Sequence, residues 1–461
     1  MTDITDKGRQ AACFSFADCH YDPGSGAATF SYRVDGTVLQ EKINFPRAPW
    51  PQDVSRQSAF YRALELLHLV AGISYYKAGL ARRIDTGELK IDRLTADFLN
   101  ELYINGLAEF AYVNQLDLAG LIDFAVNINE STAEEQASDH PFAALGSHTF
   151  ELPDRALVAM GGGKDSLVCL QMLQFAGIEV QPVCVGGSGL IGETVKAAGL
   201  PLIRIRRELS ARLAGMNADG AWNGHVPVTA INSAILLCAS LLYGYRYVVF
   251  ANESSANEAT LVDEHGNEIN HQYSKNLDFE RAFRKVISHR VCTGVEYFSL
   301  LRPFSEIAIT RRFADMPSFH RVFSSCNRNF HLDGSRIQGR WCQDCPKCRF
   351  TALALALSIQ PQQLLEIQGA DLLDQERQLQ GFKALCGLGE HKPFECVGSI
   401  AESRAAIKSL AAKPQYRDKF IVRTLAGLPE IAQSSALEFE PDFEAGHCIP
   451  AVIMAKLGPF Q

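Results

Sequence analysis

Hydrophobic and polar residues alternate over residues 14–47 in the pattern that β-strands require. The alternation is interrupted at 22–26 (Asp-Pro-Gly-Ser-Gly) and at 35–36 (Asp-Gly), which are typical turn sequences. We therefore expect an N-terminal β-meander.

Helical periodicity follows. Apolar residues recur at helical spacing over 58–80, with Ser58 as the expected N-cap and Gly79 as the expected stop. Two further helices are expected near 93–105 and 115–127.

From residue 156 onward, short apolar strands alternate with helical stretches, which is typical of a parallel, doubly wound α/β sheet. In such sheets, ligands bind at the carboxyl ends of the strands. The chain then becomes mostly helical, through 353–357 and 402–413. The expected strands are 156–160, 178–185, 200–206 and 247–251, and the expected helices between them are 165–175, 192–198 and 226–243.

The 461 residues, 47% of them hydrophobic, are enough for two or three domains, and the polar stretch 130–148 has the composition of a linker. We expect four regions with different roles. They are a β and helical domain at 1–150, a nucleotide-binding domain at 151–320, a cysteine-rich insert at 321–350 and a helical domain at 351–461.

Charge and hydropathy restrict the partners. The formal net charge of −8 disfavours a nucleic-acid partner, which usually needs a broad basic face. The polar amino terminus lacks the apolar core of a signal peptide. The apolar stretch 230–251 is interrupted by Asn232, Gly244 and Arg246, so it predicts a buried helix and strand, with no membrane partner. Thirteen cysteines are then expected to be reduced or metal-bound in the cytoplasm.

Three consecutive glycines, Gly161, Gly162 and Gly163, separate an expected strand from an expected helix. Such a turn aims backbone N–H groups and the positive helix end at one point, where an anion binds. Lys164 can add a positive charge, and Asp165 can hold Mg²⁺. Without a ligand, the same segment would be an ordinary strand-to-helix turn.

Three phosphate-binding motifs compete for this loop. A Walker loop requires Ser or Thr after the lysine, where Asp165 stands, and a dinucleotide fingerprint requires Gly or Ala in place of Ser166. The pattern Ser-Gly-Gly-x-Asp-Ser of the PP-loop ATP pyrophosphatases agrees at five of six positions, and Gly161 replaces its first serine. The loop thus resembles that superfamily. The resemblance implies that ATP is split to AMP and pyrophosphate. Asn252 and Glu253, which end the expected strand at 247–251, and Gly186 are expected near the nucleotide or its metal.

Cys342, Cys345 and Cys348 are spaced by two residues each, and Cys326 lies upstream across a polar loop. Four thiolates at such spacing predict a structural zinc site, since they leave no open coordination position. An iron–sulfur cluster or unrelated buried thiols are the alternatives. Several PP-loop enzymes that make 7-deazaguanine nitriles carry a similar cluster.

Four more polar segments, 222–232, 250–256, 324–329 and 391–398, follow strands or fill loops. Each alone is explained by a helix cap or a turn. Together with 160–166 and Trp341-Cys342, they resemble the ATP-dependent epimerases of UDP-N-acetylmuramoyl-L-alanyl-L-glutamate, a family of peptidoglycan-precursor enzymes, over nearly the whole chain.

The mechanism that this resemblance implies is chemically reasonable. The α-hydrogen of the terminal L-glutamate is a very poor acid beside a free carboxylate. Adenylation by ATP, with Mg²⁺, converts that carboxylate into an anhydride whose carbonyl accepts the carbanion's charge. A base removes the proton from one face, an acid returns one to the other, and hydrolysis releases the D-glutamyl product.

Candidate residues for these steps follow from the segments. Lys164 and Asp165 are expected to act on the phosphates. Cys396, flanked by Glu395, His391 and Lys392, is the first candidate for proton transfer, and His225 is the second. A buried structural cysteine or a loop histidine is the simpler explanation for each. The expected substrate-binding residues are Asn223, Thr229, Asn232, Asn327, Arg328, Asn329 and Lys392.

Two other functions fit part of the sequence. One is a PP-loop enzyme that amidates or thiolates a nucleobase of the 7-deazaguanine or tRNA type, although the acidic charge disfavours tRNA. The other is a non-catalytic nucleotide-binding scaffold, which the absent first serine of the loop allows.

Overall fold

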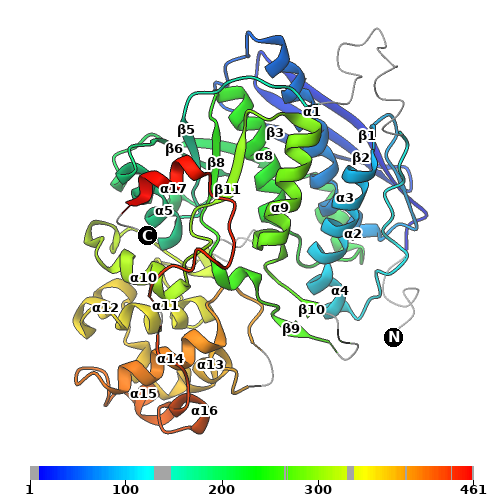
Figure 1. The fold of residues 1–461 in the computed structure, drawn as a ribbon. Helices are drawn as coiled ribbons and strands as arrows, with labels where there is room; N and C mark the ends of the chain where they lie inside the picture. Colours follow the sequence, from blue (N-terminus) through cyan, green and yellow to red (C-terminus); the bar gives the residue numbers. More distant parts are fainter. Residues whose placement is uncertain are drawn as a thin grey trace. The chain divides into compact units, whose positions relative to one another are not determined.

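The fold is α/β, with a large and mostly parallel central sheet and many helices (Figure 1). The structure is a computed structural model and describes residues 10–128, 147–263, 266, 268–329, 337–389, 392–437 and 439–458. Most of the expected linker at 130–148 therefore lies outside the described residues. Within the described residues, nine strands form one sheet in the order β11-β8-β5-β6-β7-β3-β2-β1-β4.

The strands occur close to where the hydrophobic pattern predicts them. The N-terminal meander is confirmed, and the four strands expected after residue 155 are present. The short strands β9 and β10 form a separate two-stranded sheet. The bounds are β1 Cys13–Asp22, β2 Ala27–Val34, β3 Thr37–Asn44, β4 Arg83–Asp85, β5 Arg155–Ala159, β6 Glu179–Val185, β7 Ile203–Glu208, β8 Tyr247–Phe250, β9 Leu261–Val262, β10 Glu268–Ile269 and β11 Glu296–Ser299.

The meander is an extension of the central sheet. Strand β3 pairs antiparallel with β7, with Ile43 opposite Arg207. The carboxylate of Glu41, which is fully buried, accepts two hydrogen bonds from Arg207, at 2.7 and 3.2 Å. A bidentate Arg–carboxylate pair fixes both groups in one orientation, so it holds the register of these two strands.

The chain divides into two compact units. Unit 1 comprises residues 1–157, 203–248 and 272–298, and unit 2 comprises residues 158–202, 249–271 and 299–461. Both units combine segments that are distant in the sequence, whereas the four regions expected from the sequence are consecutive.

Helices of unit 1 cover its strands, with α1 packed on α8 and α3 packed on α9 (Figure 1). A π-helical turn at Ile287–Val291 continues α9. The bounds are α1 Val54–Ala71, α2 Ile73–Gly79, α3 Arg93–Gly106, α4 Ala108–Asn114, α7 Ala211–Ala218, α8 Val228–Tyr243 and α9 Leu277–Val286, with a 3₁₀ turn at Tyr273–Lys275.

Two expectations for unit 1 are wrong in detail. Helix α1 begins four residues before Ser58, because the side chain of Asp53 accepts a hydrogen bond from Ser55 N at 2.9 Å and caps the helix there. The helix expected at 115–127 is absent. Gln115 ends α4 in the left-handed conformation, at φ 55°, and the described chain that follows it is turn and coil.

Unit 2 is rich in helices. Helix α10 packs against both α5 and α11, and α11 packs against α13 and α14, which appear in yellow to orange in Figure 1. The bounds are α5 Lys164–Phe175, α6 Gly189–Ala197, α10 Glu306–Ala314, α11 Pro346–Ala356, α12 Pro361–Gln368, α13 Leu379–Leu385, α14 Ile400–Ala411, α15 Phe420–Leu425, α16 Pro429–Ala432 and α17 Ala451–Leu457, with 3₁₀ turns at Ser254–Asn257, Pro317–Phe319, Asn327–Asn329, Leu372–Asp374 and Glu376–Gln378.

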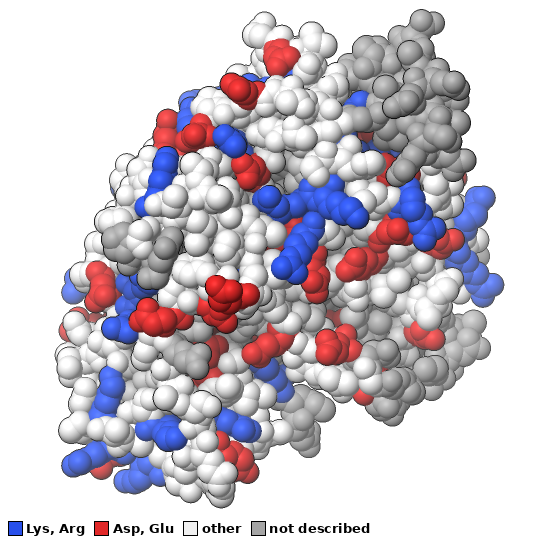
Figure 2. Space-filling view, viewed as in Figure 1, with Lys and Arg blue, Asp and Glu red and all other residues white. Residues whose placement is uncertain are grey.

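The helices and the surface charges of the protein bear on its possible partners. Within the residues described above, no helix has the length and apolar character needed to cross a membrane. The stretch 230–251 instead forms most of α8 and the buried strand β8, as expected. On the face shown in Figure 2, basic and acidic side chains lie in small, interspersed groups.

Candidate active site

The triple-glycine loop connects β5 to α5. Gly162 has φ +81°, a conformation that side chains with a Cβ rarely adopt, and its carbonyl accepts a hydrogen bond from Ser324 N at 3.2 Å. Gly163 occupies the N-cap of α5, without a side-chain cap. A Cβ placed on Gly161 would meet no atom within 4 Å. The loop therefore has the open backbone and the helix N-terminus that an anion requires.

Lys164, the first residue of α5, is buried and forms ion pairs with two carboxylates, those of Asp165 and Glu306. Burial lowers the pKa of Lys164, but Asp165 and Glu306 together raise it above its usual value. The pKa of Glu306 is raised to about 7, mainly by burial and then by the negative charge of Asp165, while the positive charge of Lys164 lowers it. Lys164 thus stays charged, while two carboxylates compete for its single ammonium.

Two more glutamates lie in the same electrostatic environment. Glu253, at the end of the segment that follows β8, is buried and accepts hydrogen bonds from Ser255 N and Oγ at 2.5 and 2.8 Å. Its pKa is raised by burial and then by the charges of Glu306 and Glu402. Asp165 and Glu306 contact Lys164, and Glu253 and Glu402 interact with Glu306, so the mutual repulsion of four carboxyl groups favours protonation or the binding of a cation.

Glu402 joins two helices through their first turns. Its Oε2 accepts a hydrogen bond from Ser399 N at 2.8 Å, within the capping box of α14. Its Oε1 accepts another from Ile307 N, at 3.0 Å, in the first turn of α10. A carboxylate at two helix N-termini is stabilising, because it satisfies two free N–H groups and both helix dipoles. Glu306 and the segment that ends at Ser399 are thereby held together.

A small cavity of about 10 Å³ lies beside the triple-glycine loop. This volume corresponds to about one water molecule. Cys396, half-buried, contributes to the lining together with Lys164 and Asp165, so the structure brings this expected catalytic residue to the expected phosphate-binding residues. The lining residues are Lys164, Asp165, Glu306, Ser325, Lys347, Phe350, Thr351 and Cys396.

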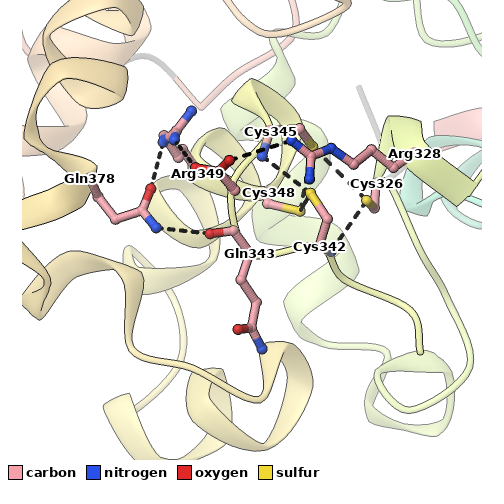
Figure 3. A network of polar contacts seen from close by, with 9 residues as sticks. Cys326, Arg328, Cys342, Gln343, Cys345, Cys348, Arg349 and Gln378 are labelled. Carbon is pink, nitrogen blue, oxygen red and sulfur yellow. Dashed lines mark hydrogen bonds and ion pairs between the residues drawn. The ribbon is translucent and has the colours of Figure 1, made fainter. Parts of the chain in front are cut away.

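The four cysteines Cys326, Cys342, Cys345 and Cys348 converge, with all sulfur atoms within 4.8 Å of one another (Figure 3). Three of the Sγ–Sγ distances are 3.7, 4.0 and 3.5 Å. Tetrahedral zinc with Zn–S bonds of about 2.3 Å separates its sulfurs by about 3.8 Å. Hydrogen bonds from Cys345 and Cys348 lower the pKa of Cys326 to about 4. The donor set therefore fits a single thiolate-bound metal ion.

Two sets of hydrogen bonds hold the segments that carry these cysteines. Arg349 donates to Asp344 at 2.6 Å and to Gln378 at 2.7 Å, and Gln378 donates to Gln343 O at 2.8 Å (Figure 3). In a second set of contacts, Ser324 Oγ donates to Arg340 O at 2.6 Å and accepts from Cys326 N at 3.2 Å. Because Ser324 N also binds Gly162 O, the cluster and the phosphate loop share one hydrogen-bond network.

The other expected residues of unit 2 have identified contacts. Asn327 hydrogen-bonds Glu395, whose pKa is raised by burial and then by Cys345. Asn329 is buried and donates to Arg340 O at 2.7 Å, which indicates a structural role. The remaining contacts are Arg328 with Asp344 at 3.4 Å, Lys392 with Glu258 at 3.9 Å, Asn252 with Ser299 Oγ at 2.9 Å, Ser166 Oγ with Gly163 O at 3.2 Å, and Gly186 O with Cys184 Sγ at 3.6 Å.

Four expected residues lie in unit 1. His225 is 3.5 Å from Glu109, and Asn223 Oδ1 accepts a hydrogen bond from Lys77 Nζ at 3.1 Å. Lys77 is buried, which lowers its pKa to about 8, and it also donates to Gly224 O at 3.0 Å. Thr229 and Asn232 lie half-buried at the start of α8. His391 lies outside the described residues.

Residues 5–300 of the chain match the MurL N-terminal domain, and residues 322–438 match the MurL C-terminal domain. The chain belongs to the MurL family. Three curated relatives bear the name UDP-N-acetyl-alpha-D-muramoyl-L-alanyl-L-glutamate epimerase. The protein of Xanthomonas oryzae pv. oryzae is 41% identical over 97% of both chains. Those of Micromonospora sp. and Salinispora tropica are 39% and 37% identical, each over 93% of this chain and over 93% and 91% of their own.

Three residues with notable contacts or positions, Glu306, Lys347 and Lys77, were not among the candidate residues expected from the sequence. Glu306 follows Ser305 at the start of α10, a pattern that indicates only a helix cap, and its partner Lys164 is 142 positions away. Lys347 lies between two clustered cysteines, a position that gives no sign of the cavity it lines. A single lysine in an apolar helical stretch, such as Lys77, carries no signal of its contacts.

Proposed function

We propose that this protein is an ATP-dependent epimerase of UDP-MurNAc-L-Ala-L-Glu, which inverts the terminal L-glutamate to D-glutamate and releases AMP and pyrophosphate. The main support is the near full-length similarity to curated proteins of that name, at 37–41% identity. The triple-glycine loop, which resembles a PP-loop, supports the dependence on ATP.

The phosphate loop supplies groups suited to a nucleotide. Lys164 and the N-terminal turn of α5 are positive partners for phosphate oxygens. Mg²⁺ prefers carboxylate and phosphate oxygens, and Asp165, Glu306 and Glu253 offer carboxylates in a region of surplus negative charge. Bound there, Mg²⁺ would neutralise charge on the leaving pyrophosphate. Asp165, half-exposed beside Lys164, is the first residue that we assign to it.

The chemistry begins with attack of the glutamate α-carboxylate oxygen on the α-phosphorus of ATP, which breaks the bond to pyrophosphate. Lys164 stabilises the charge that develops on the departing group. In the mixed anhydride, the α-proton becomes acidic enough for a side chain to remove. Water then cleaves the anhydride and frees AMP, so each epimerisation consumes one ATP.

Cys396 is our first assignment for proton transfer. A thiol has an ordinary pKa near 8.5 and exchanges protons readily at neutral pH. The half-buried Cys396 lines the same cavity as Lys164 and Asp165, which would bring it close to an acyl group activated at the phosphate loop. Glu395 is a weaker candidate, because its Oε2 accepts the Lys347 N–H at 3.3 Å.

The cysteine cluster fits structural zinc. Four thiolates around a single ion leave no coordination position for substrate, and the sulfur spacing agrees with one tetrahedral ion. In an iron–sulfur cluster the four thiolates are divided among two or four irons, so they would lie farther apart than around a single ion. We further propose that the enzyme works in the cytoplasm on a soluble nucleotide substrate, without a nucleic-acid or membrane partner.

Incubation with ATP, Mg²⁺ and UDP-MurNAc-L-Ala-L-Glu in deuterated water tests the proposal. We expect pyrophosphate release that depends on the muramoyl substrate, and one deuterium at the glutamate α-carbon of the D-product, measured by mass spectrometry after chiral analysis. Pyrophosphate without deuterium would instead indicate an amidating or thiolating enzyme. Absence of turnover by the metal-loaded protein would refute catalysis on this substrate.

A further inference from the structure

Lys347 lies between two of the clustered cysteines, Cys345 and Cys348, in the first turn of α11. Lys347 lines the same cavity as Lys164 and Asp165. In the described part of the chain, Lys164 has two carboxylates within 4.0 Å, whereas the ammonium of Lys347 has none. Lys347 is therefore a cation of this cavity without an ion pair within 4.0 Å among the described residues, although its charge lowers the pKa of Glu395.

The charges around the triple-glycine loop suggest why a second lysine is needed there. Asp165 and Glu306 already pair with Lys164, and Glu253 and Glu402 lie in the same electrostatic environment. A triphosphate entering this region needs positive groups that are not engaged elsewhere. Lys347 is one, and the N-terminus of the eleven-residue helix α11, which has no side-chain cap, adds to it.

We propose that Lys347 is a second phosphate-binding lysine, presented by the four-cysteine cluster, which contacts the β- or γ-phosphate of ATP and then the departing pyrophosphate. The inference rests on the proposed function and adds a role for the cluster beyond folding. The cavity of about 10 Å³ is too small for a phosphate group, so the side chains that line it must rearrange when the nucleotide binds.

The cluster is well placed to hold Lys347. Cys345 and Cys348 fix the backbone on either side of it, and Glu395 accepts the N–H of Lys347 at 3.3 Å. The hydrogen bond from Ser324 N to Gly162 O attaches the same insert to the phosphate loop. Metal binding and nucleotide binding are then thermodynamically linked, because both depend on the position of this one turn.

Calorimetric binding of ATP, pyrophosphate and AMP, with Mg²⁺ and without the muramoyl substrate, tests the role of Lys347. We expect Lys347→Gln to weaken pyrophosphate and ATP binding about tenfold, since a charge-assisted hydrogen bond is lost. AMP, which lacks the β- and γ-phosphates, should bind as it does to the wild type. Lys347→Arg should restore most of the affinity. Lys196→Gln, which removes an exposed lysine from α6, is the matched control.

The outcomes separate this inference from the proposed function. Unchanged pyrophosphate affinity in Lys347→Gln would overturn the inference alone. Equal weakening of AMP and pyrophosphate, or loss of bound metal in elemental analysis, would also overturn it, since the lysine would then act only on the fold. A wild-type protein that binds neither ATP nor pyrophosphate would refute the ATP dependence itself.

Discussion

The ammonium of Lys164 and the carboxylate of Glu306 form a buried ion pair, although the residues are 142 positions apart in the chain. Lys164 begins α5 and Glu306 begins α10, so the pair joins the first turns of two helices that pack together. The lysine of the phosphate loop is thereby oriented by a second element.

Two neighbouring glycines of the loop should respond oppositely to substitution. Gly162→Ala forces a Cβ into the left-handed conformation, at φ +81°, which costs roughly 1–2 kcal/mol, and moves the loop. We expect kcat/KM for ATP to fall about 100-fold. Gly161→Ser restores the serine of the PP-loop pattern, and its Cβ would meet nothing within 4 Å.

Gly161→Ser should accordingly stay within about threefold of the wild type in kcat/KM, or exceed it, as for most unstrained surface changes. Steady-state release of pyrophosphate measures both variants. A severe loss in Gly161→Ser combined with tolerance of Gly162→Ala would contradict the assignment of the loop.

Replacement of Cys396 should separate the two halves of the reaction. Cys396→Ala removes the proposed proton-transfer group, so we expect deuterium incorporation and D-product to fall at least about 100-fold. Activation of the carboxylate does not use the thiol, so pyrophosphate release should persist within about tenfold. Cys448→Ala, another half-buried cysteine of unit 2, is the control. Equal loss of both signals would assign Cys396 to binding or folding instead.

The raised pKa of Glu306 predicts a pH-dependent stability difference. Its folded-state pKa is about 7 against an ordinary value of 4.5, so the folded protein holds this proton more tightly than the unfolded chain. The stabilising contribution is complete below pH 4.5 and is lost as the pH rises through 7, by about 3 kcal/mol. Glu306→Gln cannot ionise and does not undergo this loss.

Urea denaturation of wild type and Glu306→Gln between pH 4.5 and 8 measures this effect. The difference in unfolding free energy should shift by about 3 kcal/mol in favour of the glutamine variant as the pH rises. Glu444→Gln, at an exposed position, should show no such trend. A difference for Glu306→Gln that does not vary with pH would mean that Glu306 remains an ordinary carboxylate.

Removal of one thiolate should remove the metal. Cys345→Ala leaves three ligands for a tetrahedral ion, so we expect elemental analysis to find far less than one zinc per chain and stability to fall by about 4 kcal/mol or more. Cys13→Ala, outside the cluster, should keep its metal and its melting temperature. Full zinc content in Cys345→Ala would exclude the four-cysteine site.

Local pattern was sufficient for most of the fold and for part of the site. The alternation of apolar strands and helices predicted β5 to β8 and the helices between them, because buried strands and amphipathic helices carry their own periodicity. At 115–127, an apolar pattern was mistaken for a helix, since nothing in it revealed that Gln115 adopts the left-handed conformation. The pairing of β3 with β7 was also not predictable, because strand partners depend on long-range contacts.

The residues of the candidate site were likewise only partly predictable from the sequence. The glycine loop and the cysteine spacing were readable, because backbone conformation and metal coordination require particular residues at fixed intervals. Glu306 and Lys347 were not recognised as members of the site, because their roles depend on contacts with residues far along the chain. A charged residue in the first turn of a helix can cap the helix, pair with another charge or bind a ligand. Only the folded structure shows which groups lie near it.

The antiparallel pairing of β3 with β7 has a consequence for any attempt to shorten the protein. Without the first fifty residues, β7 would present unpaired backbone groups over residues 206–208, and Arg207 would lose its carboxylate partner. An open edge of this kind recruits strands from other molecules. A fragment beginning at residue 151 should therefore aggregate, and the amino-terminal strands act as a built-in guard against self-association.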